Sequence, residues 1–224
     1  MSEVHEFSNG VRLRRDHLLP VQLERYAEIN LHEPEEEAWI TKMLDEIGEA
    51  GLFVDVGAAV GYYCFLVARL RPKFEIRAFE PDAANRARLA ENRALNGNPT
   101  IRLHAQAVCD RIGSATLAGE GFMAMLAPGQ GKPVPTTTLT EIAAGAGRPI
   151  DLLKMDIQGG EHAALIGAEG ALKQRLIRRW IVGTHHPDLH AWCVDRFRGH
   201  KYRIVFEAAQ VPHQPDGMIV AAAP

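Results

Sequence analysis

Seven short apolar runs, separated by helix-like segments, dominate the chain from residue 52 onward. The runs are 52–56, 76–79, 101–103, 150–155, 180–182, 204–206 and 218–222. Apolar runs this short, without regular polar alternation, are typical of strands buried on both faces of a parallel sheet. The alternation therefore predicts an α/β fold, in which a mainly parallel, seven-stranded sheet carries helices on both faces.

The first fifty residues have a different, more charged texture. Glu35, Glu36 and Glu37 lead into apolar residues at helical spacing, which end at Ile47. We therefore expect residues 1–50 to form a helical extension that packs on a larger domain, residues 51–224. A second helix is predicted over 83–95, because Asp82 can cap its first turn and a glycine follows its end.

Composition excludes several classes of protein. The chain has 224 residues, of which 46% are hydrophobic and 24% charged, as in ordinary folded domains. Its net charge is −3 and its basic residues are scattered, so we expect no nucleic-acid partner. The three cysteines are far apart, which fits a reducing cytoplasm. No signal peptide and no apolar run of ~20 residues is visible, so no membrane contact is expected.

One stretch interrupts the α/β alternation. Residues 119–135 hold four glycines and three prolines, too many for a helix or a central strand. We expect a mobile surface loop here that could close over a ligand.

The first predicted strand runs into a turn of small residues. The turn reads Asp55, Val56, Gly57, Ala58, Ala59, Val60 and Gly61. Such a turn lets the backbone approach a ligand closely. It is neither a P-loop nor a G-x-G-x-x-G motif, since Ala59 and Tyr62 stand where glycines are required. With Asp55 at the strand end, a ligand that carries an ammonium group fits better than a pyrophosphate.

A second acid lies at the end of the next predicted strand. Glu80, followed by Pro81, stands nineteen residues beyond Gly61. A carboxylate in this place can accept both hydroxyl groups of a ribose. Alternatively, Asp55 and Glu80 only cap helices. Their occurrence together, at the ends of adjacent strands, favours a nucleoside-binding site.

This pair resembles the S-adenosylmethionine site of Rossmann-like methyltransferases, and residues 30–206 are similar to the FkbM-type methyltransferase family. Three blocks carry the family resemblance: Lys-Met-Asp-Ile-Gln-Gly-Gly-Glu at 154–161, Ala-Val-Cys-Asp at 107–110, and Gly-Thr-His at 183–185. The second block resembles the family's third-strand segment beside the adenine. The chain departs from the family pattern at Ala59, Thr140 and Gln158, where Asn, Asp and Glu are common. Because position 158 lacks a carboxylate, we expect no metal site.

The resemblance implies a Rossmann-like methyltransferase fold with S-adenosylmethionine as the cofactor. It implies a cofactor site built from Asp55, Val56, Gly57, Ala58, Gly61, Tyr62, Glu80, Pro81, Ala107, Val108 and Asp156. It also implies methyl transfer, which we expect to be O-methylation of a sugar, a glycan or another small metabolite. His185, at the carboxyl end of a predicted strand, is the expected general base, because imidazole titrates near neutral pH. Asp156 is the alternative base, and it could instead hold the cofactor's ammonium group or place the acceptor.

Other readings of the same residues stay open. His186 and His190 have the spacing of two metal ligands on a helix, but Pro187 indicates a helix start, so we expect a structural or exposed role for His190, and likewise for His32. Glu161 is expected to be a first-turn helix acid. An NAD(P)-dependent oxidoreductase would also bind ribose through an acid but requires closer glycines. A non-catalytic nucleoside-binding protein would bind the cofactor without turnover.

Overall fold

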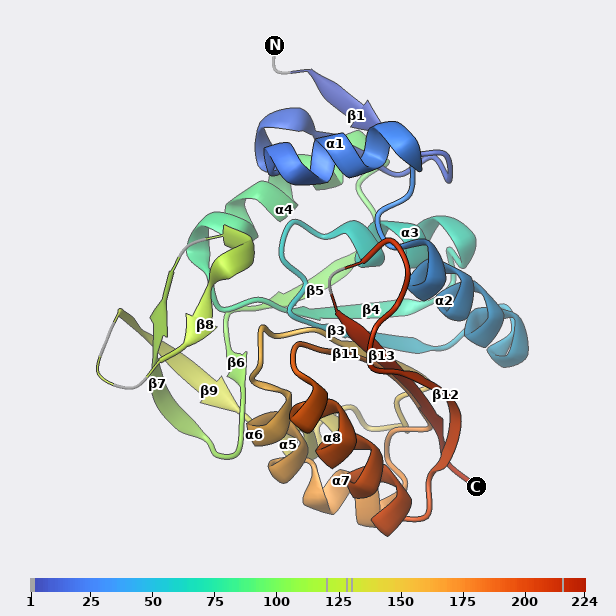
Figure 1. Ribbon diagram of the computed structural model, residues 1–224, viewed down its shortest axis with the longest axis vertical. Helices are drawn as coiled ribbons and strands as arrows, with labels where there is room; N and C mark the ends of the chain where they lie inside the picture. The colour runs from blue at the N-terminus through green and yellow to red at the C-terminus, as the bar shows by residue number, and fades with distance from the viewer. Residues whose placement is uncertain (1–2, 120, 128, 130, 215) are drawn as a thin grey trace.

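The computed structural model describes residues 3–119, 121–127, 129, 131–214 and 216–224. Its central sheet has seven strands in the order β12-β13-β11-β10-β3-β4-β5, which confirms the predicted α/β architecture (Figure 1). The strands are β3 (Leu52–Val56), β4 (Glu75–Phe79), β5 (Ile101–His104), β10 (Leu152–Met155), β11 (Arg179–Thr184), β12 (Arg203–Ala208) and β13 (Gly217–Ala222). Among the described strands of this sheet, β13 runs antiparallel to both its neighbours, β11 and β12, and all other neighbouring pairs are parallel.

Each predicted apolar run lies in one of these strands. The run 150–155 is shortened, because Ile150 forms only an isolated bridge with Ile177 and β10 begins at Leu152. The antiparallel direction of β13 could have been predicted from the sequence. The connection from Ala208 to Gly217 is too short for the crossover of a dozen or more residues that parallel strands require.

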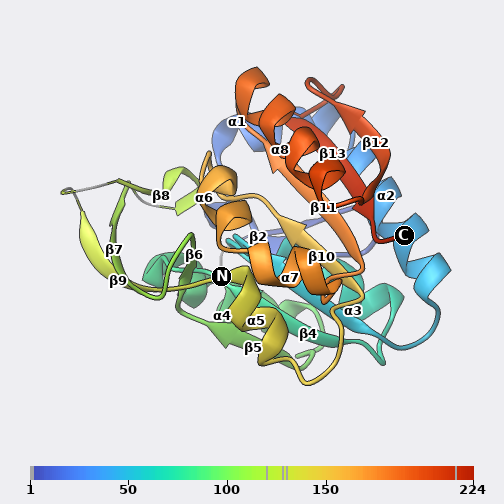
Figure 2. The same cartoon turned by 90° about the horizontal axis from the view of Figure 1, so that it is seen from below.

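Helices cover both faces of the central sheet. In Figures 1 and 2, one group contains α2 (Pro34–Ile47), α3 (Tyr62–Leu70) and α4 (Ala83–Leu95), and the other contains α5 (Leu139–Ala144), α6 (Glu161–Ile166), α7 (Glu169–Gln174) and α8 (Pro187–Gly199). Side chains of a strand alternate between the faces, so Phe53 lies in the core under α2 and α3, whereas Val54 lies in the core under α5 to α8. Asp55 therefore points to the α2–α3 side, where it is fully buried.

The N-terminal segment shares the core of the larger domain. It forms a hairpin of β1 (Val4–Glu6) and β2 (Arg12–Arg14), followed by α1 (Pro20–Glu28) and the predicted helix α2. Phe7 and Leu13 belong to the same apolar cluster as Phe65 of α3. The hairpin lies at the top of Figure 1, and the sequence patterns did not predict it.

A second, smaller sheet stands beside the first. Its strands are β6 (Ala107–Val108), β7 (Gly113–Ala118), β8 (Met125–Leu126) and β9 (Lys132–Thr137), in the order β6-β9-β7-β8. The stretch 119–135, expected to be a surface loop with neither a helix nor a central strand, contains β8 and most of β9 of this smaller sheet. Residues 120, 128 and 130 of the stretch lie outside the described chain. The block 107–110 likewise begins with a strand of this sheet, not of the central one.

The prolines of β9 explain how so punctuated a segment forms a strand. Pro133 and Pro135 are two residues apart, so their missing N–H groups fall on one side of the strand. On its other side β9 pairs with β7 from Lys132 to Thr136. It pairs with β6 only at Thr136 and Thr137, beyond the prolines. The prolines thus occupy an open edge, where no ladder hydrogen bond is lost.

Gly57 is required by the packing of the chain. Its φ is +83°, and a Cβ added to it would lie 2.0 Å from the carbonyl oxygen of Asp156. Gly97 has a similar φ of +78°, but nothing lies within 4 Å of an added Cβ. We expect both Gly→Ala substitutions to cost about 1–2 kcal/mol from the left-handed backbone, and Gly57→Ala to cost at least ~2 kcal/mol more. Urea unfolding of the two variants measures the difference, and equal losses would contradict the collision.

Candidate active site

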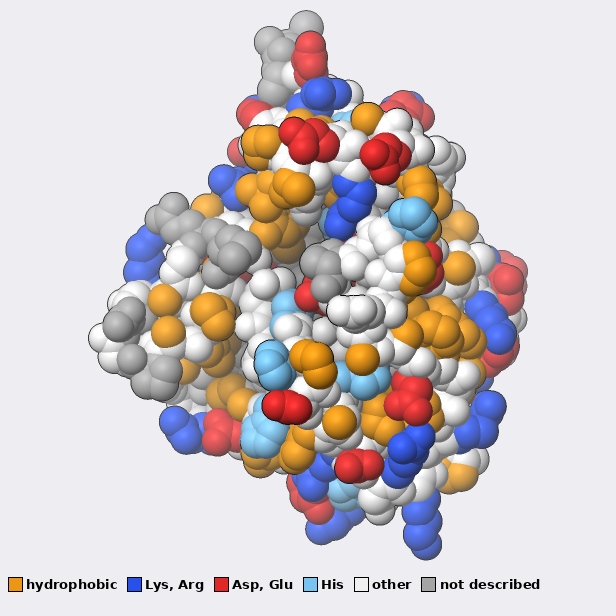
Figure 3. All heavy atoms as spheres, in the orientation of Figure 1, with side chains coloured by type: hydrophobic (Ala, Val, Ile, Leu, Met, Phe, Trp, Pro, Cys, Tyr) orange, Lys and Arg blue, Asp and Glu red, His pale blue; other side chains and the backbone are white. Residues whose placement is uncertain are grey.

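A cavity opens where β3, β4 and β10 end, between the central and the smaller sheet. Figure 3 shows the surface of the molecule in the orientation of Figure 1, with the N-terminal segment above and histidine side chains gathered over α6 and α8 below. The predicted residues that line the cavity are Val56, Gly57, Ala58, Tyr62, Glu80, Pro81, Ala107, Val108 and Asp156. Asp55, Gly61 and His185 were also predicted for the site but are not part of this lining. The crevice thus lies where open α/β sheets bind ligands, at the carboxyl ends of strands.

The small-residue turn is fastened to the end of β4. The backbone N–H groups of Gly57 and Ala58 donate to the carbonyl oxygen of Phe79, at 2.9 and 3.2 Å. The N–H of Ala59 donates to Oε2 of Glu80 at 2.8 Å. Gly61 begins α3 with a φ of +94°, and an added Cβ would lie 2.8 Å from the Leu89 side chain. These contacts give the turn a fixed shape, with Gly61 serving the packing of α3 against α4.

Glu80 presents a buried carboxylate to the cavity. Its Oε1 accepts a hydrogen bond from the N–H of Asp82 at 2.8 Å, while Oε2 accepts the one from Ala59. Burial raises the pKa of Glu80 to about 7, against the effect of these two bonds. Each carboxylate oxygen keeps a free lone pair. The side chain therefore both fastens the turn and retains acceptors, as binding to ribose hydroxyls requires.

Asp55 lies outside the lining, in the core between β3 and α3. Its side chain is fully buried, and Oδ2 accepts a hydrogen bond from Sγ of Cys64 at 3.3 Å. Oδ1 has no hydrogen-bond partner among the described residues. Burial raises the pKa of Asp55, and the nearby ammonium of Lys154 opposes that rise. Its direct contact with the cofactor stays a prediction.

Lys154 is a buried cation that lines the cavity, and the sequence analysis assigned it no role. Its Nζ lies 3.7 Å from Oδ2 of Asp156 and 4.5 Å from the ring centroid of Tyr63. Burial would lower the pKa of Lys154, but Glu36, Asp156 and other acids outweigh it and raise that pKa. The chain did hold a signal: a charged residue between Leu153 and Met155 of a buried strand requires a partner.

His32 reaches the same cavity from the N-terminal segment. Its Nδ1 contacts the hydroxyl group of Tyr26, and its ring centroid lies 4.7 Å from that of Tyr62. Burial lowers the pKa of His32. The expectation of a structural or exposed role missed this placement, because no spacing in the chain connects residue 32 with the turn at 57–61.

An apolar wall faces the turn from the smaller sheet. It consists of Ala107, Val108, Leu117, Phe122, Ala124, Met125 and Leu126. Four of these residues, from Phe122 to Leu126, belong to the stretch that was expected to close over the ligand. A wall of this kind suits the flat, apolar faces of a heterocyclic base.

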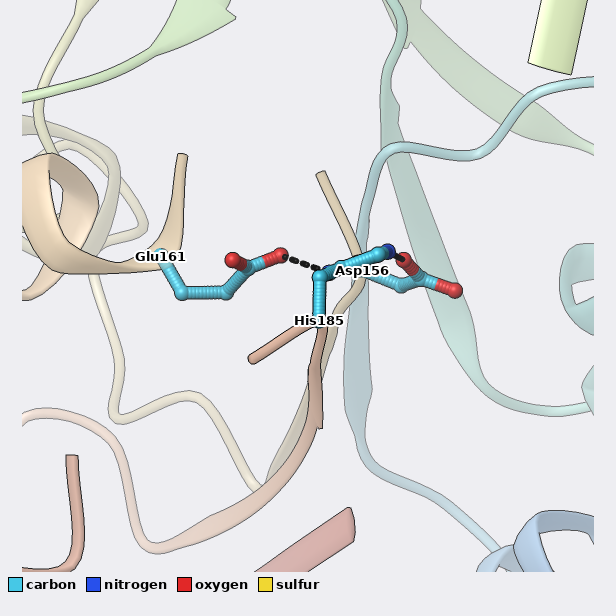
Figure 4. Close-up of side chains that lie close together, drawn as sticks. All are labelled: Asp156, Glu161 and His185. Carbon is cyan, nitrogen blue, oxygen red and sulfur yellow. Dashed lines mark ion pairs between the residues drawn. The ribbon is translucent and has the colours of Figure 1, made fainter. Parts of the chain in front are cut away.

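His185 lies between two carboxylates at the edge of the cavity (Figure 4). Its Nε2 is 3.2 Å from Oδ1 of Asp156, and its Nδ1 is 3.2 Å from Oε1 of Glu161. Asp216 is a third acid, with Oδ2 at 3.7 Å from Nε2. Glu161 is indeed the first residue of α6, as predicted, but it is fully buried and belongs to this cluster.

The charge of His185 follows from these neighbours. Burial would lower its pKa, but the contacts with Asp156 and Glu161 outweigh burial and raise the pKa of His185 to about 10. Burial likewise opposes ionisation of Asp156, yet Lys154 and His185 lower the pKa of that carboxyl. In this arrangement the imidazole is protonated at neutral pH, so it cannot accept a further proton while both carboxylates hold it.

The two histidines with the spacing of helical metal ligands, His186 and His190, have structural contacts. His186 precedes α8 and accepts a hydrogen bond from the N–H of Asp188 at 3.2 Å, as expected of a helix start at Pro187. His190 is buried, and its Nδ1 lies 2.9 Å from the hydroxyl oxygen of Thr184. The two rings therefore do not act as a pair of ligands.

Comparison with known families identifies the class of protein, because residues 55–215 match the family described as "Methyltransferase FkbM domain". The chain belongs to the FkbM methyltransferase family, and S-adenosylmethionine is its cofactor. This membership sets aside the oxidoreductase alternative.

Solved structures share the fold. They include a precorrin-6y C5,15-methyltransferase from Geobacter metallireducens GS-15, with a TM-score of 0.54, 13% identity, and coverage of 84% of this chain and 87% of that chain. Fibrillarin from Aeropyrum pernix, solved with natively bound S-adenosyl-L-methionine, has a TM-score of 0.54, 12% identity, and coverage of 85% and 74%. No curated protein matches the chain. None of the described helices is long and apolar enough to cross a membrane.

Replacing Lys154 should destabilise the fold. Lys154→Met leaves the acids around it without their cation, and breaking a buried ion pair costs about 3–5 kcal/mol. Lys173→Met is the matched control, since Lys173 pairs with Glu169 at 2.8 Å but is 66% exposed, and such pairs contribute only about 0.3–0.5 kcal/mol. Urea unfolding measures both variants. Equal, small losses would show that Lys154 does not compensate the buried acids.

Affinity for S-adenosylhomocysteine should rise with pH through the ionisation of Glu80. Only the ionised carboxylate accepts from both ribose hydroxyls, and with a pKa of about 7 the ionised fraction grows as the pH rises past that value. From pH 6 to pH 8 that fraction increases about tenfold, so titration calorimetry should show a similar gain. Glu80→Gln should remove the gain and weaken binding at pH 8. A parent affinity that stays constant with pH would contradict this assignment.

Proposed function

We propose that this methyltransferase acts on a hydroxyl oxygen of a sugar, a glycan or another small metabolite. The observation that carries the proposal is the meeting of Asp156 and His185, 3.2 Å apart, at the edge of the cofactor cavity. Two polar side chains at this edge can bind the O–H group of an acceptor and remove its proton.

The residues of the cavity fit S-adenosylmethionine. Glu80 offers free lone pairs for ribose, and the wall that contains Leu117 and Phe122 offers an apolar face for adenine. Buried acids complement the cofactor's positive charges. When bound, the sulfonium supplies an electrophilic methyl group, so the protein's own task is to align the acceptor and to exclude water.

The acceptor side is built by the ends of β10 and β11. Lys154 holds Oδ2 of Asp156, which leaves Oδ1 toward His185 and the cavity edge. An acceptor hydroxyl that donates to Asp156 would be oriented for in-line displacement. His185 would act as the base only in its neutral form, after it has released its own proton to solvent. The hydroxyl proton would then pass to the Asp156–His185 pair as the new O–CH₃ bond forms and the S–CH₃ bond breaks.

The charge of this region favours a neutral or cationic acceptor over a nucleic acid. Asp156, Glu161 and Asp216 all lie within 3.7 Å of His185 and would repel a phosphate backbone. Several surface arginines pair with acids, as Arg178 does with Asp151. These contacts support a partner other than RNA or DNA.

Removal of His185 should reduce turnover strongly without emptying the cofactor site. We expect His185→Ala to lower the rate of S-adenosylhomocysteine release, with a small hydroxylated acceptor, by about 10²–10⁴-fold. Cofactor affinity should change little, because His185 does not line the cavity. His186→Ser is the control, since this exposed side chain only caps α8 and serine keeps the cap.

One result would change the base and another would overturn the proposal. Full turnover of His185→Ala together with loss in Asp156→Asn would make Asp156 alone the base. Tight binding of S-adenosylhomocysteine, without product from any of a panel of hydroxylated acceptors, would reject O-methylation and leave the non-catalytic alternative.

A further inference from the structure

We propose that Asp156, Glu161 and His185 form a binding site for one divalent metal ion at the acceptor edge of the cavity. The location of the ion follows from these side chains alone. Its role in catalysis rests on the proposed function, since the ion would bind the acceptor's hydroxyl oxygen.

The three side chains have the spacing of ligands to one ion. Each offers one ligand atom, and these atoms all lie within 4.8 Å of one another. Metal bonds to imidazole nitrogen and carboxylate oxygen are about 2.0–2.2 Å long, so ligand atoms of one ion stand roughly 3–4.4 Å apart. One ring nitrogen of His185 can bind the ion, and each nitrogen lies 3.2 Å from one of the two carboxylates. The imidazole lies between these carboxylates, so it must turn until a single nitrogen faces the ion together with both acids.

The atoms that face each other in this cluster make ion-pair contacts of 3.2 Å, but none of them has a hydrogen bond of normal geometry with a described residue. They are Oδ1 of Asp156 and both ring nitrogens of His185, and all of them are buried. Glu161 has a fully buried side chain, and its Oε2 also has no partner. Buried polar atoms without partners are rare in folded proteins and call for a missing ligand.

Neighbouring groups hold the ligands in place, as outer-shell partners do in metal sites. Lys154 engages Oδ2 of Asp156 and so leaves Oδ1 to the ion. The N–H of Ile157 donates to Oε1 of Glu161 at 2.9 Å. Asp216 stands near enough, with Oδ2 at 3.7 Å from His185, to add a fourth ligand.

Gln158 does not weaken this site, although its lack of a carboxylate led us to expect no metal. Its side chain belongs to the lining of the cavity, and the described cluster does not include it. Glu161 supplies the acid that position 158 lacks. A search for acids that extended three residues beyond position 158 would have found Glu161.

The donor set indicates the class of metal. One imidazole and two or three carboxylates suit Mn²⁺, Zn²⁺ or Fe²⁺ better than soft ions. An open coordination position would take the acceptor oxygen and make its proton easier to remove. That proton would pass to solvent through the carboxylates, as the new O–CH₃ bond forms and the S–CH₃ bond breaks. The ion would replace the proton that His185 now carries between two acids.

Binding of Mn²⁺ alone tests the site. The purified full chain is treated with EDTA, freed of chelator and titrated with Mn²⁺, while electron paramagnetic resonance measures the free ion. We expect one saturable site in the parent protein. Since outer-shell changes already cost about 10–100-fold in metal affinity, Glu161→Gln and His185→Ala should each weaken binding at least tenfold.

Glu169→Gln is the matched control. Glu169 also contacts a histidine, His200, at 3.2 Å, but it is half-exposed and lies outside the cluster. Its loss should leave Mn²⁺ affinity unchanged. Circular dichroism checks that each variant is folded, and the parent titration decides even if a variant is not.

The outcomes separate the metal site from O-methylation. Absence of saturable Mn²⁺ binding to the parent, or equal binding by the parent and both cluster variants, rejects the metal site. Full methylation of hydroxylated acceptors after chelation would then leave the proposed function standing. Binding at the cluster, without methylation of any hydroxyl, would support the site and reject O-methylation.

Discussion

The buried ammonium of Lys154 is the interaction on which the rest of the site depends. It lies opposite Asp55 in the register of β10 and β3, and Asp156 follows two residues later on the same face of the chain. Glu33, just before α2, adds negative charge from the N-terminal segment. Buried carboxylates are unfavourable without a cation. The packing of α2 over the ends of β3 and β10 therefore requires this one charge.

Asp156 connects the two halves of the site through its two oxygens. Oδ2 belongs to Lys154, and Oδ1 faces His185. The same residue also lines the cofactor cavity. One carboxylate therefore separates Lys154 and the cofactor cavity from His185. The parallel strands β10 and β11 make this possible, since their carboxyl ends lie side by side.

Local signals in the chain were sufficient for the central sheet and for much of the cavity. Buried strands are recognised by their short length and apolar residues, and the turn at Gly57 by its small residues. Several residues of the cavity lining, from Val56 to Glu80, could therefore be predicted. What the patterns missed depends on contacts between distant segments. His32 meets the turn only because the N-terminal segment folds back over α3. The strand β9 forms despite two prolines, because its partner lies on the side that they leave free.

The balance of charge around the cavity explains why a cationic cofactor suits it. Acids outnumber bases here: Asp55, Asp156, Glu33, Glu36, Glu161 and Asp216 surround Lys154 and His185. Burial raises the pKa values of Glu36 and Asp216, the latter to about 6, so protons offset part of this charge. A bound cation can take over that role. Methyl transfer turns a sulfonium into a neutral thioether, which such a cavity holds less tightly, so the same acids that favour the cofactor also favour release of its product.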